Sequence, residues 1–223
     1  METRGIILGS YSTVAKGWTL TSWNLSPARR KEYLVDKPGG SGHWDLSTVL
    51  TDGEPVYEAR TLTVTLECSE GDRLSREAEI DNMVNQLEGY TVEIFLPDQG
   101  EVLRYLKGVV HVERLYNDPV HASVTVTAVC DPWKYAYYET VINLTATTKE
   151  KSEAIILNGR MPVVPVLWVH DGARINLVVD GESWALSAGE YKIPNLRMTP
   201  NSGKLIKYSG SGSFDISYRE AVL

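Results

Sequence analysis

Cysteine is scarce in this chain, and its scarcity bears on disulfides, metals and cofactors. The 223 residues contain only Cys68 and Cys130, which lie far apart and have no metal-ligand spacing. So few cysteines cannot build a disulfide framework, which favours synthesis in a reducing compartment. Each falls on the apolar phase of an alternating pattern, so we expect two buried free thiols. We predict no metal site and no cofactor.

Long apolar runs and an excess of basic charge are also missing. No apolar segment approaches the roughly 18 residues of a membrane-spanning helix, and the segment METRGIILGS does not have the form of a signal peptide. We therefore expect a soluble protein without membrane insertion. The formal net charge is −7 and the pI about 5.2, with the acidity concentrated in the front half of the chain. That balance argues against specific binding to nucleic acid phosphates.

Phenylalanine is rare as well, with 2 Phe against 6 Trp and 12 Tyr. Trp and Tyr combine an apolar ring with a polar group, which suits half-wet surfaces such as subunit contacts or sugar-binding platforms. Ordinary aromatic residues at sheet edges explain the same bias equally well. The aromatic composition alone leaves these alternatives open.

Phosphate-binding and nucleophile motifs are absent from the glycine-rich stretch KPGGSGHWDLS, residues 37–47. A phosphate loop needs a Lys-Ser or Lys-Thr pair that enters a helix, whereas His-Trp-Asp follows here. A hydrolase using His43 and Asp45 stays as an alternative, although no nucleophile elbow accompanies them. We interpret the stretch as a bend and predict no catalytic residue. Its expected turn and interface residues are Gly39, Gly40, Gly42 and Trp44.

The remaining polar candidates favour solvated surfaces over chemistry. His111 and His121 lie near strand ends and could meet across a hairpin, but two imidazoles do not define a zinc site. Carboxylate pairs such as Asp180 and Glu182 lie in turns, where solvation explains them. We expect a protein without enzymatic activity.

Alternation of apolar and polar residues dominates the rest of the chain. The segments ARTLTVTLEC, residues 59–68, and HASVTVTAVC, residues 121–130, alternate with a period of two. This pattern predicts strands with one covered face and one Thr-rich face. Residues 90–110 predict a hairpin that turns at residues 97–100.

One segment has a helical period instead. Its apolar residues recur at i, i+3, i+4 and i+7 and form a single stripe: Ile80, Met83, Val84 and Leu87. Ser75 is the expected N-cap, and Gly89 is the expected stop. The sequence therefore predicts one helix laid on a sheet.

These patterns predict a mainly β fold with one α-helix and two domains. Residues 1–140 form a β-sandwich-like domain that carries the helix, and residues 141–158, Thr-rich and then charged, form a connector with an edge strand. In residues 159–223, short strands are separated by Gly-marked turns at the close spacing of a β-sandwich.

Several segments follow, in order, the motif pattern of a known family. KPGGSGHWDLS resembles its PG-x-DG turn, although Ser41 stands where the family often has Asp, and EARTLTVTLEC resembles the strand that follows. TVTAVCDPWKY resembles the run that closes its first domain, and IKYSGSGSFDISYREAVL resembles its last strand. Over essentially the whole chain, the sequence thus resembles the distal tail proteins of long, non-contractile-tailed phages. The closing run adds three expected interface residues: Pro132, Trp133 and Tyr135.

The resemblance implies a structural role in a virion, at the tip of the tail. The first domains, called belt domains, would form a hexameric ring, a homo-oligomer with a lumen through which DNA passes. The implied partners are the tail tube protein, the tape-measure protein, and tail-associated hub, fibre or receptor-binding proteins. The protein would be made in the host cytoplasm and serve in host attachment. A negatively charged lumen would keep DNA from adhering.

The family's second domain is similar to galectins, which suggests a glycan-binding β-sandwich module as the alternative function. Here His170 and Arg174 keep the galectin spacing, but the Asn and Pro between them are missing, and Trp184 lacks its Glu. Larger members of the family insert carbohydrate-binding modules, for which this chain has no room. The candidate glycan platform consists of Trp168, His170, Arg174 and Trp184.

Overall fold

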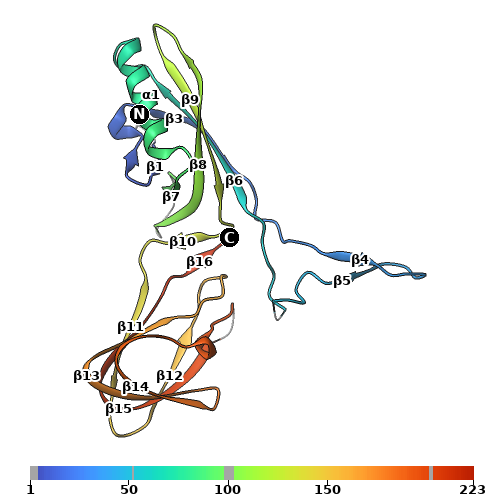
Figure 1. Cartoon of the computed structure of the whole chain (residues 1–223), viewed down its shortest axis with the longest axis vertical. Coiled ribbons are helices and arrows are strands. Elements are labelled where there is room, and N and C mark those ends of the chain that lie inside the picture. The colour runs from blue at the N-terminus through green and yellow to red at the C-terminus, as the bar shows by residue number, and fades with distance from the viewer. Residues whose placement is uncertain (1–4, 52, 98–102, 201–202) are drawn as a thin grey trace. The chain divides into compact units, whose positions relative to one another are not determined.

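The computed structural model describes residues 5–51, 53–97, 103–200 and 203–223, and it consists mainly of strands (Figure 1). The described part of the chain contains a single α-helix. The predicted fold class, mainly β with one helix, is therefore confirmed. The chain divides into two compact units. The N-terminal unit comprises residues 1–101 and 105–134, and the C-terminal unit comprises residues 102–104 and 135–223.

An antiparallel sheet forms the body of the N-terminal unit, with strand order β2-β1-β7-β8-β9-β6-β3. Along β6, Leu62 and Val64 are buried, whereas Thr63 between them is exposed. The Thr/Val alternation thus turns one face of the sheet into the core and leaves the other face polar. The strands are β1 (Ile7–Leu8), β2 (Tyr11–Ser12), β3 (Thr19–Leu25), β6 (Arg60–Cys68), β7 (Thr91–Phe95), β8 (Arg104–Asn117) and β9 (Ala122–Cys130), and the short 3-10 helix η1 spans Val14–Lys16.

The predicted hairpin and helix both form. β7 and β8 pair antiparallel, which confirms the hairpin, while most of its predicted turn lies outside the described residues. The helix α1 (Arg73–Leu87) buries Ile80, Met83 and Leu87 in the core of the N-terminal unit. Full burial of a side chain of this size contributes roughly 1.5–3 kcal/mol. The apolar stripe therefore holds the helix on the apolar face of the sheet.

The helix begins one turn earlier than expected, so the N-cap prediction was wrong. Asp72, not Ser75, is the N-cap, and its carboxylate accepts a hydrogen bond from the Ser75 backbone N–H at 2.7 Å. The Ser75 side chain, followed by this backbone hydrogen bond, lowers the pKa of Asp72. A carboxylate at this position satisfies a free N–H group as a Ser hydroxyl would. At the other end, Gly89 has φ +74° and ends the helix as predicted.

Acid should weaken the attachment of the helix end to β8 through Glu88. Its carboxylate accepts a hydrogen bond from the Val112 backbone N–H at 2.7 Å and lies 2.9 Å from His111 Nδ1. The Val112 contact, followed by the His111 contact, lowers the pKa of Glu88. A lowered carboxylate pKa stabilises the fold above the unfolded-state value of about 4.3. That stabilisation is lost as the pH falls through the lower folded-state value.

We therefore expect Glu88→Gln to lower the melting temperature at pH 7 and to flatten its decline between neutral and acidic pH. Thermal unfolding measured across this range tests the expectation. Glu113→Gln on the same strand is the matched control, because Glu113 has no hydrogen-bond or ion-pair partner among the described residues. Equal pH profiles for the two variants would contradict the assignment.

A second antiparallel sheet forms the C-terminal unit, with order β11-β15-β13-β14, and β12 pairs with β15. The long central strands β13 and β15 carry the core of this unit, because their inward residues alternate along their length. The strands of this sheet are β11 (Thr140–Ala146), β12 (Lys151–Ile156), β13 (Val166–Val179), β14 (Glu182–Lys192) and β15 (Gly203–Tyr218), and the 3-10 helix η2 spans Pro194–Leu196. Two short strands outside this sheet, β10 (Lys134–Ala136) and β16 (Ala221–Val222), pair with each other.

Residues 141–158, predicted as a connector with an edge strand, belong to the C-terminal sheet and do not form a connector. It holds β11 and β12, which pair with the two halves of β15. Leu144 and Ile155 are buried in the core of the C-terminal unit. The Thr-rich composition that indicated a linker belongs to the outward face of a strand, where Thr is favoured. Along the chain, the boundary between the two units accordingly lies between residues 134 and 135.

Each unit has its own apolar core, and both cysteines lie in that of the N-terminal unit. Cys68 and Cys130 are free and buried, as predicted. Burial raises the pKa of the Cys130 thiol to about 11. Among the described residues, none of the helices combines the length and the apolar composition that crossing a bilayer requires.

Candidate assembly interface

Residues 27–59 leave the N-terminal sheet after β3 and return to it at β6; we call this segment the arm. It contains the hairpin of β4 (Leu34–Asp36) and β5 (His43–Asp45), which pair with each other and with no other strand in the described chain. The register joins Asp36 to His43 and Leu34 to Asp45. In Figure 1 the hairpin is drawn as a separate two-stranded ribbon beyond the end of β6.

The glycine-rich stretch forms the tip of the arm. The Lys37 backbone N–H donates to the Gly42 carbonyl at 3.2 Å, and the Gly40 N–H donates to the Lys37 carbonyl at 3.2 Å. Gly39 and Gly42 have φ values of +71° and +84°. No atom lies within 4 Å of a Cβ built on either glycine, so backbone conformation and not space selects glycine there.

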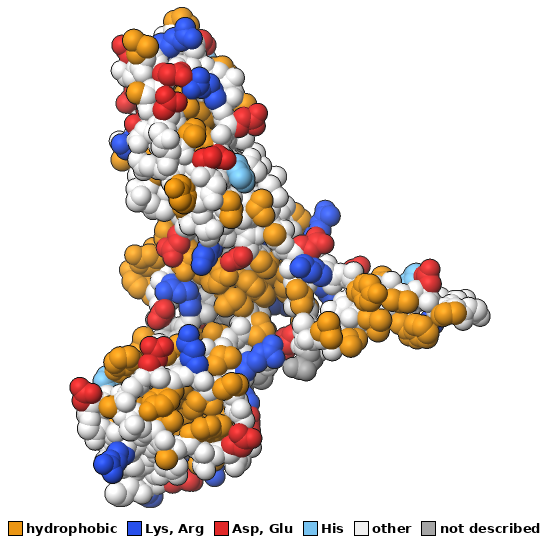
Figure 2. Space-filling view, in the orientation of Figure 1, with side chains coloured by type: hydrophobic (Ala, Val, Ile, Leu, Met, Phe, Trp, Pro, Cys, Tyr) orange, Lys and Arg blue, Asp and Glu red, His pale blue; other side chains and the backbone are white. Residues whose placement is uncertain are grey.

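The arm has no core of its own. Of the residues that the structure describes between positions 27 and 59, none is buried. Leu50 is 96 % exposed and Trp44 is 51 % exposed. Figure 2 shows apolar side chains along much of the arm, and its large exposed apolar residues are Tyr33, Leu34, Trp44, Leu46, Val49 and Leu50. An isolated two-stranded hairpin is marginally stable in water, and a contiguous exposed apolar surface marks an interaction site.

Hydrogen bonds fix the base of the arm. The Ser26 N–H donates to the Thr61 carbonyl at 2.9 Å, and the Thr61 N–H donates to Ser26 Oγ at 2.8 Å. Arg60, 6 % exposed, donates through Nε to the Ser26 carbonyl at 2.7 Å. Desolvation lowers the pKa of Arg60. These contacts tie the two ends of the arm together at one point of the sheet.

The sequence-predicted residues of the closing run lie near this base or beyond it. Trp133 packs edge-to-face on Tyr57 of the arm, with ring centroids 5.3 Å apart. Pro132 precedes it and is partly buried, and Tyr135 belongs to β10 of the C-terminal unit. The sequence did not predict a role for Ser26, Arg60 or the apolar segment around Leu50. Their role depends on where the arm leaves the sheet, which local patterns do not show.

The structure does not join His43 and Asp45 into a catalytic pair. His43 Nδ1 lies 2.7 Å from Asp36 Oδ1, whereas Asp45 receives hydrogen bonds from the Ser47 N–H at 2.9 Å and Arg30 NH2 at 3.0 Å. The Ser47 contact, followed by Arg30, lowers the pKa of Asp45. Each side chain is thus engaged by a different partner.

The other two histidines of the N-terminal unit do not converge on a metal site. His111 is placed beside Glu88, and His121 lies 3.6 Å from Asp118. Within the described ranges, no group of three or more His, Cys, Asp or Glu side chains could hold a metal ion.

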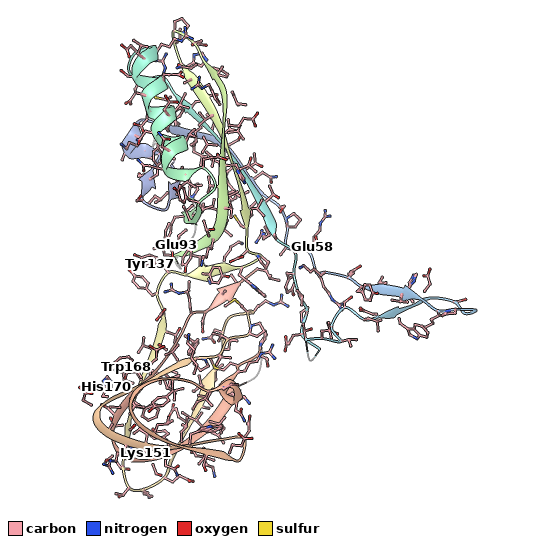
Figure 3. The ribbon with its side chains drawn as sticks, in the orientation of Figure 1. Glu58, Glu93, Tyr137, Lys151, Trp168 and His170 are labelled. Carbon is pink, nitrogen blue, oxygen red and sulfur yellow. The ribbon has the colours of Figure 1, made fainter. Side chains whose placement is uncertain are left out.

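The four residues of the candidate glycan platform do not share one surface. Residues paired across antiparallel strands present their side chains on the same face. Trp184 pairs with the buried Leu177 and packs partly against the core, whereas Trp168 pairs with the exposed Glu190 on the opposite face. Figure 3 labels Trp168 and His170 on neighbouring positions of the C-terminal unit. The predicted platform is therefore divided, with Trp184 on the inner side.

Arg174 is also separated from Trp168 and His170. A register shift in β13 lies between Val169 and Arg174, where the strand bulges. Arg174 resumes the pairing beyond the bulge, opposite Ser187 and Ser211. Only Trp168 and His170 of the four remain together.

Comparisons with known proteins identify the fold of the whole chain. No protein-family model matches the sequence, and no curated protein does. Among solved structures, the chain is similar to the SPP1 Dit (gp 19.1) protein, described as a paradigm of hub adsorption apparatus in phages that infect Gram-positive hosts. The TM-score is 0.67 at 14 % identity, and the match covers 96 % of this chain and 98 % of that one. A chain of the phage p2 baseplate in its activated conformation with Sr matches over the same shares, with a TM-score of 0.49 and 9 % identity.

Proposed function

We propose that this protein is a structural hub component at the distal tip of a long, non-contractile phage tail, where six copies form a ring. The observation that carries the proposal is the fold likeness to the SPP1 Dit protein, because it extends over nearly the full length of both chains. A shared fold alone does not fix a function. The arm supplies independent support, because its exposed apolar side chains would be buried by a binding partner.

A neighbouring copy of the chain is the proposed partner of the arm. A ring requires a heterologous contact, in which one surface of each copy binds a different surface of the next. An arm anchored at its base and apolar along its length supplies the first of these surfaces. Trp44 at the tip and Trp133 at the base act in this scheme as interface anchors, because aromatic residues are enriched at the centres of such contacts.

The polar face of the N-terminal sheet is the proposed lining of a lumen for DNA. Small hydroxyl side chains such as Thr63 and Thr127 pair across this face. Glu93 is labelled in Figure 3, and it pairs with Lys107, while Glu113 pairs with Thr125. Acidic side chains on such a face would repel the DNA backbone and prevent adhesion.

We expect phage particles that carry Glu93→Lys and Glu113→Lys to eject DNA more slowly than the wild type. The added positive charges would attract phosphates instead of repelling them. Receptor-triggered ejection measured in vitro is the readout, with Glu150→Lys and Glu153→Lys, two exposed positions of the C-terminal unit, as the charge-matched control. An unchanged ejection rate at low salt would count against the lumen assignment.

The C-terminal units are the proposed docking platforms for other tail proteins. In this arrangement the tail tube and tape-measure proteins lie on one side of the ring, and hub, fibre or receptor-binding proteins lie on the other. The role is structural and needs no catalytic residue. The protein would act in the virion, at the tail tip, during host attachment.

Native mass spectrometry over a series of protein concentrations, combined with negative-stain electron microscopy, tests the ring. We expect hexamers, or trimers that convert to hexamers, with a central opening in the images. A chain that stays monomeric at all concentrations and does not join a ring with its tail partners would overturn the proposal. Turnover of a substrate by the isolated protein would overturn the purely structural role.

A further inference from the structure

The strand β12 lies at an edge of the C-terminal sheet. It pairs with β15, and no other strand of the described chain pairs with it. An edge strand presents unpaired backbone N–H and C=O groups, and many proteins block such an edge with proline or lysine. β12 contains no proline, and its one lysine, Lys151 (labelled in Figure 3), is its first residue and donates to the Thr145 carbonyl at 3.0 Å. The rest of the edge, toward Ile156, is therefore open to a further strand.

A cavity of about 870 Å³ adjoins this end of β12. Its lining comes from β12, from the chain that follows β12 as far as Arg160, and from the start of β15. Two aliphatic side chains in the lining are largely exposed, Ile156 at 61 % and Leu205 at 58 %. Gly203 pairs with Ile156 and has no side chain to fill the space across from it. The cavity therefore offers apolar contacts directly beside the open edge.

The charges of the cavity favour an acidic ligand. Arg160 and Lys204 line it, and none of the described lining residues is an Asp or a Glu. Lys204 already contacts the Asp180 carboxylate. The Arg160 side chain is exposed and has no hydrogen-bond or ion-pair partner among the residues that the structure describes. Because a guanidinium binds a carboxylate through two parallel hydrogen bonds, a carboxylate is the natural complement of Arg160.

Contacts with β16 and the residue before it hold the segment that carries Arg160. The Arg160 backbone N–H donates to the Ala221 carbonyl at 2.7 Å. Asn158 donates through its backbone N and through Nδ2 to Glu220 Oε1, at 3.2 and 3.3 Å. A Cβ on Gly159 would lie 2.8 Å from the Ala221 carbonyl oxygen, so the two segments are in close contact there. A site whose backbone is fixed in advance loses less conformational entropy when it binds.

We propose that the open edge of β12 and this cavity bind an extended segment of another tail protein that is rich in aliphatic and acidic residues. The inference deepens the docking role proposed above for the C-terminal units and rests on it. The segment adds a strand to β12, a mode of recognition in which backbone hydrogen bonds supply affinity and side-chain pockets supply specificity. Its aliphatic side chains contact Ile156 and Leu205, and an acidic side chain pairs with Arg160. A small anion would leave the backbone groups of the edge unpaired.

Fluorescence anisotropy with the full-length protein tests the site. The probe is a labelled peptide of about ten residues that alternates valine and glutamate, and its control alternates valine and lysine. We expect saturable binding of the acidic peptide alone. N-methylation of all its valines blocks one edge of the peptide strand, and N-methylation of all its glutamates blocks the other. One of these two methylated peptides should therefore not bind.

Two single substitutions examine the cavity itself. Leu205→Asp should weaken binding about tenfold or more, because it places a carboxylate among apolar contacts. Its control is Val141→Asp, at an exposed valine of β11. Arg160→Ala should weaken binding about tenfold through loss of the ion pair. Its control is Arg174→Ala, which removes another exposed arginine that has no partner in the described part of the chain.

Several outcomes would overturn the inference. They are the absence of binding at millimolar concentration, equal binding of the acidic and basic peptides, binding of both methylated peptides, and unchanged affinity in Leu205→Asp and Arg160→Ala. Native mass spectrometry separates this site from the ring. Leu205→Asp hexamers that no longer bind the peptide support the site, whereas loss of hexamers by this variant would assign the edge to subunit contact. Wild-type hexamers that bind no peptide would overturn the docking site and leave the proposed ring standing.

Discussion

Replacing Trp44 and Leu50 by aspartate should leave the protein folded but monomeric. Both side chains are largely exposed in the single chain, so their loss removes little from its core. In a subunit contact they would be desolvated, and two unpaired carboxylates at that place would cost several kcal/mol. We therefore expect the hexamer signal to disappear in native mass spectrometry, with far-UV circular dichroism unchanged.

The matched control is Ile156→Asp/Leu205→Asp, which introduces the same two charges at exposed apolar residues of the C-terminal unit. It should assemble like the wild type. Thermal unfolding is compared at a concentration where the wild type is monomeric, because assembly itself raises the apparent stability. Wild-type assembly by the Trp44→Asp/Leu50→Asp variant would exclude the arm from the subunit contact, while leaving the ring to be formed by other surfaces.

Gly210→Ala should produce the largest loss of stability in the C-terminal unit. Gly210 has φ +134°, a conformation that other residues rarely adopt. A Cβ at this position would lie 2.0 Å from the carbonyl oxygen and 3.0 Å from the carbonyl carbon of Arg174 on the neighbouring strand. Backbone atoms cannot move aside as a flexible side chain would. We expect a loss of about 3 kcal/mol or more.

Gly172→Ala is the matched control for this substitution. Gly172 also has a positive φ, +77°, but no atom lies within 4 Å of the place that its Cβ would occupy, so only the backbone conformation is penalised. A cost of about 1–2 kcal/mol is expected there. Urea unfolding followed by tryptophan fluorescence measures both. A Gly210→Ala cost no greater than that of Gly172→Ala would contradict the close approach of the two strands.

Most of the fold that could be predicted from the sequence was predicted from the period of its apolar residues. The alternation in residues 59–68 and 121–130 and the stripe ending at Leu87 each follow from burial on one face, so local patterns predicted them. The edge strand expected in residues 141–158 forms, but the connector assignment was wrong because a strand with a Thr-rich outer face has the same composition as a linker. Pairing with β15 shows that this segment belongs to the sheet, and such a long-range contact cannot be inferred from local composition.

For the candidate sites too, local features could be predicted from the sequence and contacts between distant residues could not. The glycines of the arm tip were recognisable as a bend from spacing alone, since they serve a local turn. The division of the glycan candidates was not recognisable, because it depends on the register of β13 against β14 and on the bulge after Val169. Asp215, which the structure places beside Trp168, lies 47 positions away in the sequence.

The hydrogen bonds between Ser26 and Thr61 make the arm an insertion that could be removed without disturbing the sheet. Because the residues on either side of it are hydrogen-bonded neighbours, a short turn could replace the whole excursion while the ladder of β3 and β6 stays in register. Conversely, the arm can lengthen or change its composition with little loss of stability in the sheet. The composition of the arm can therefore change while the sheet that carries it stays the same.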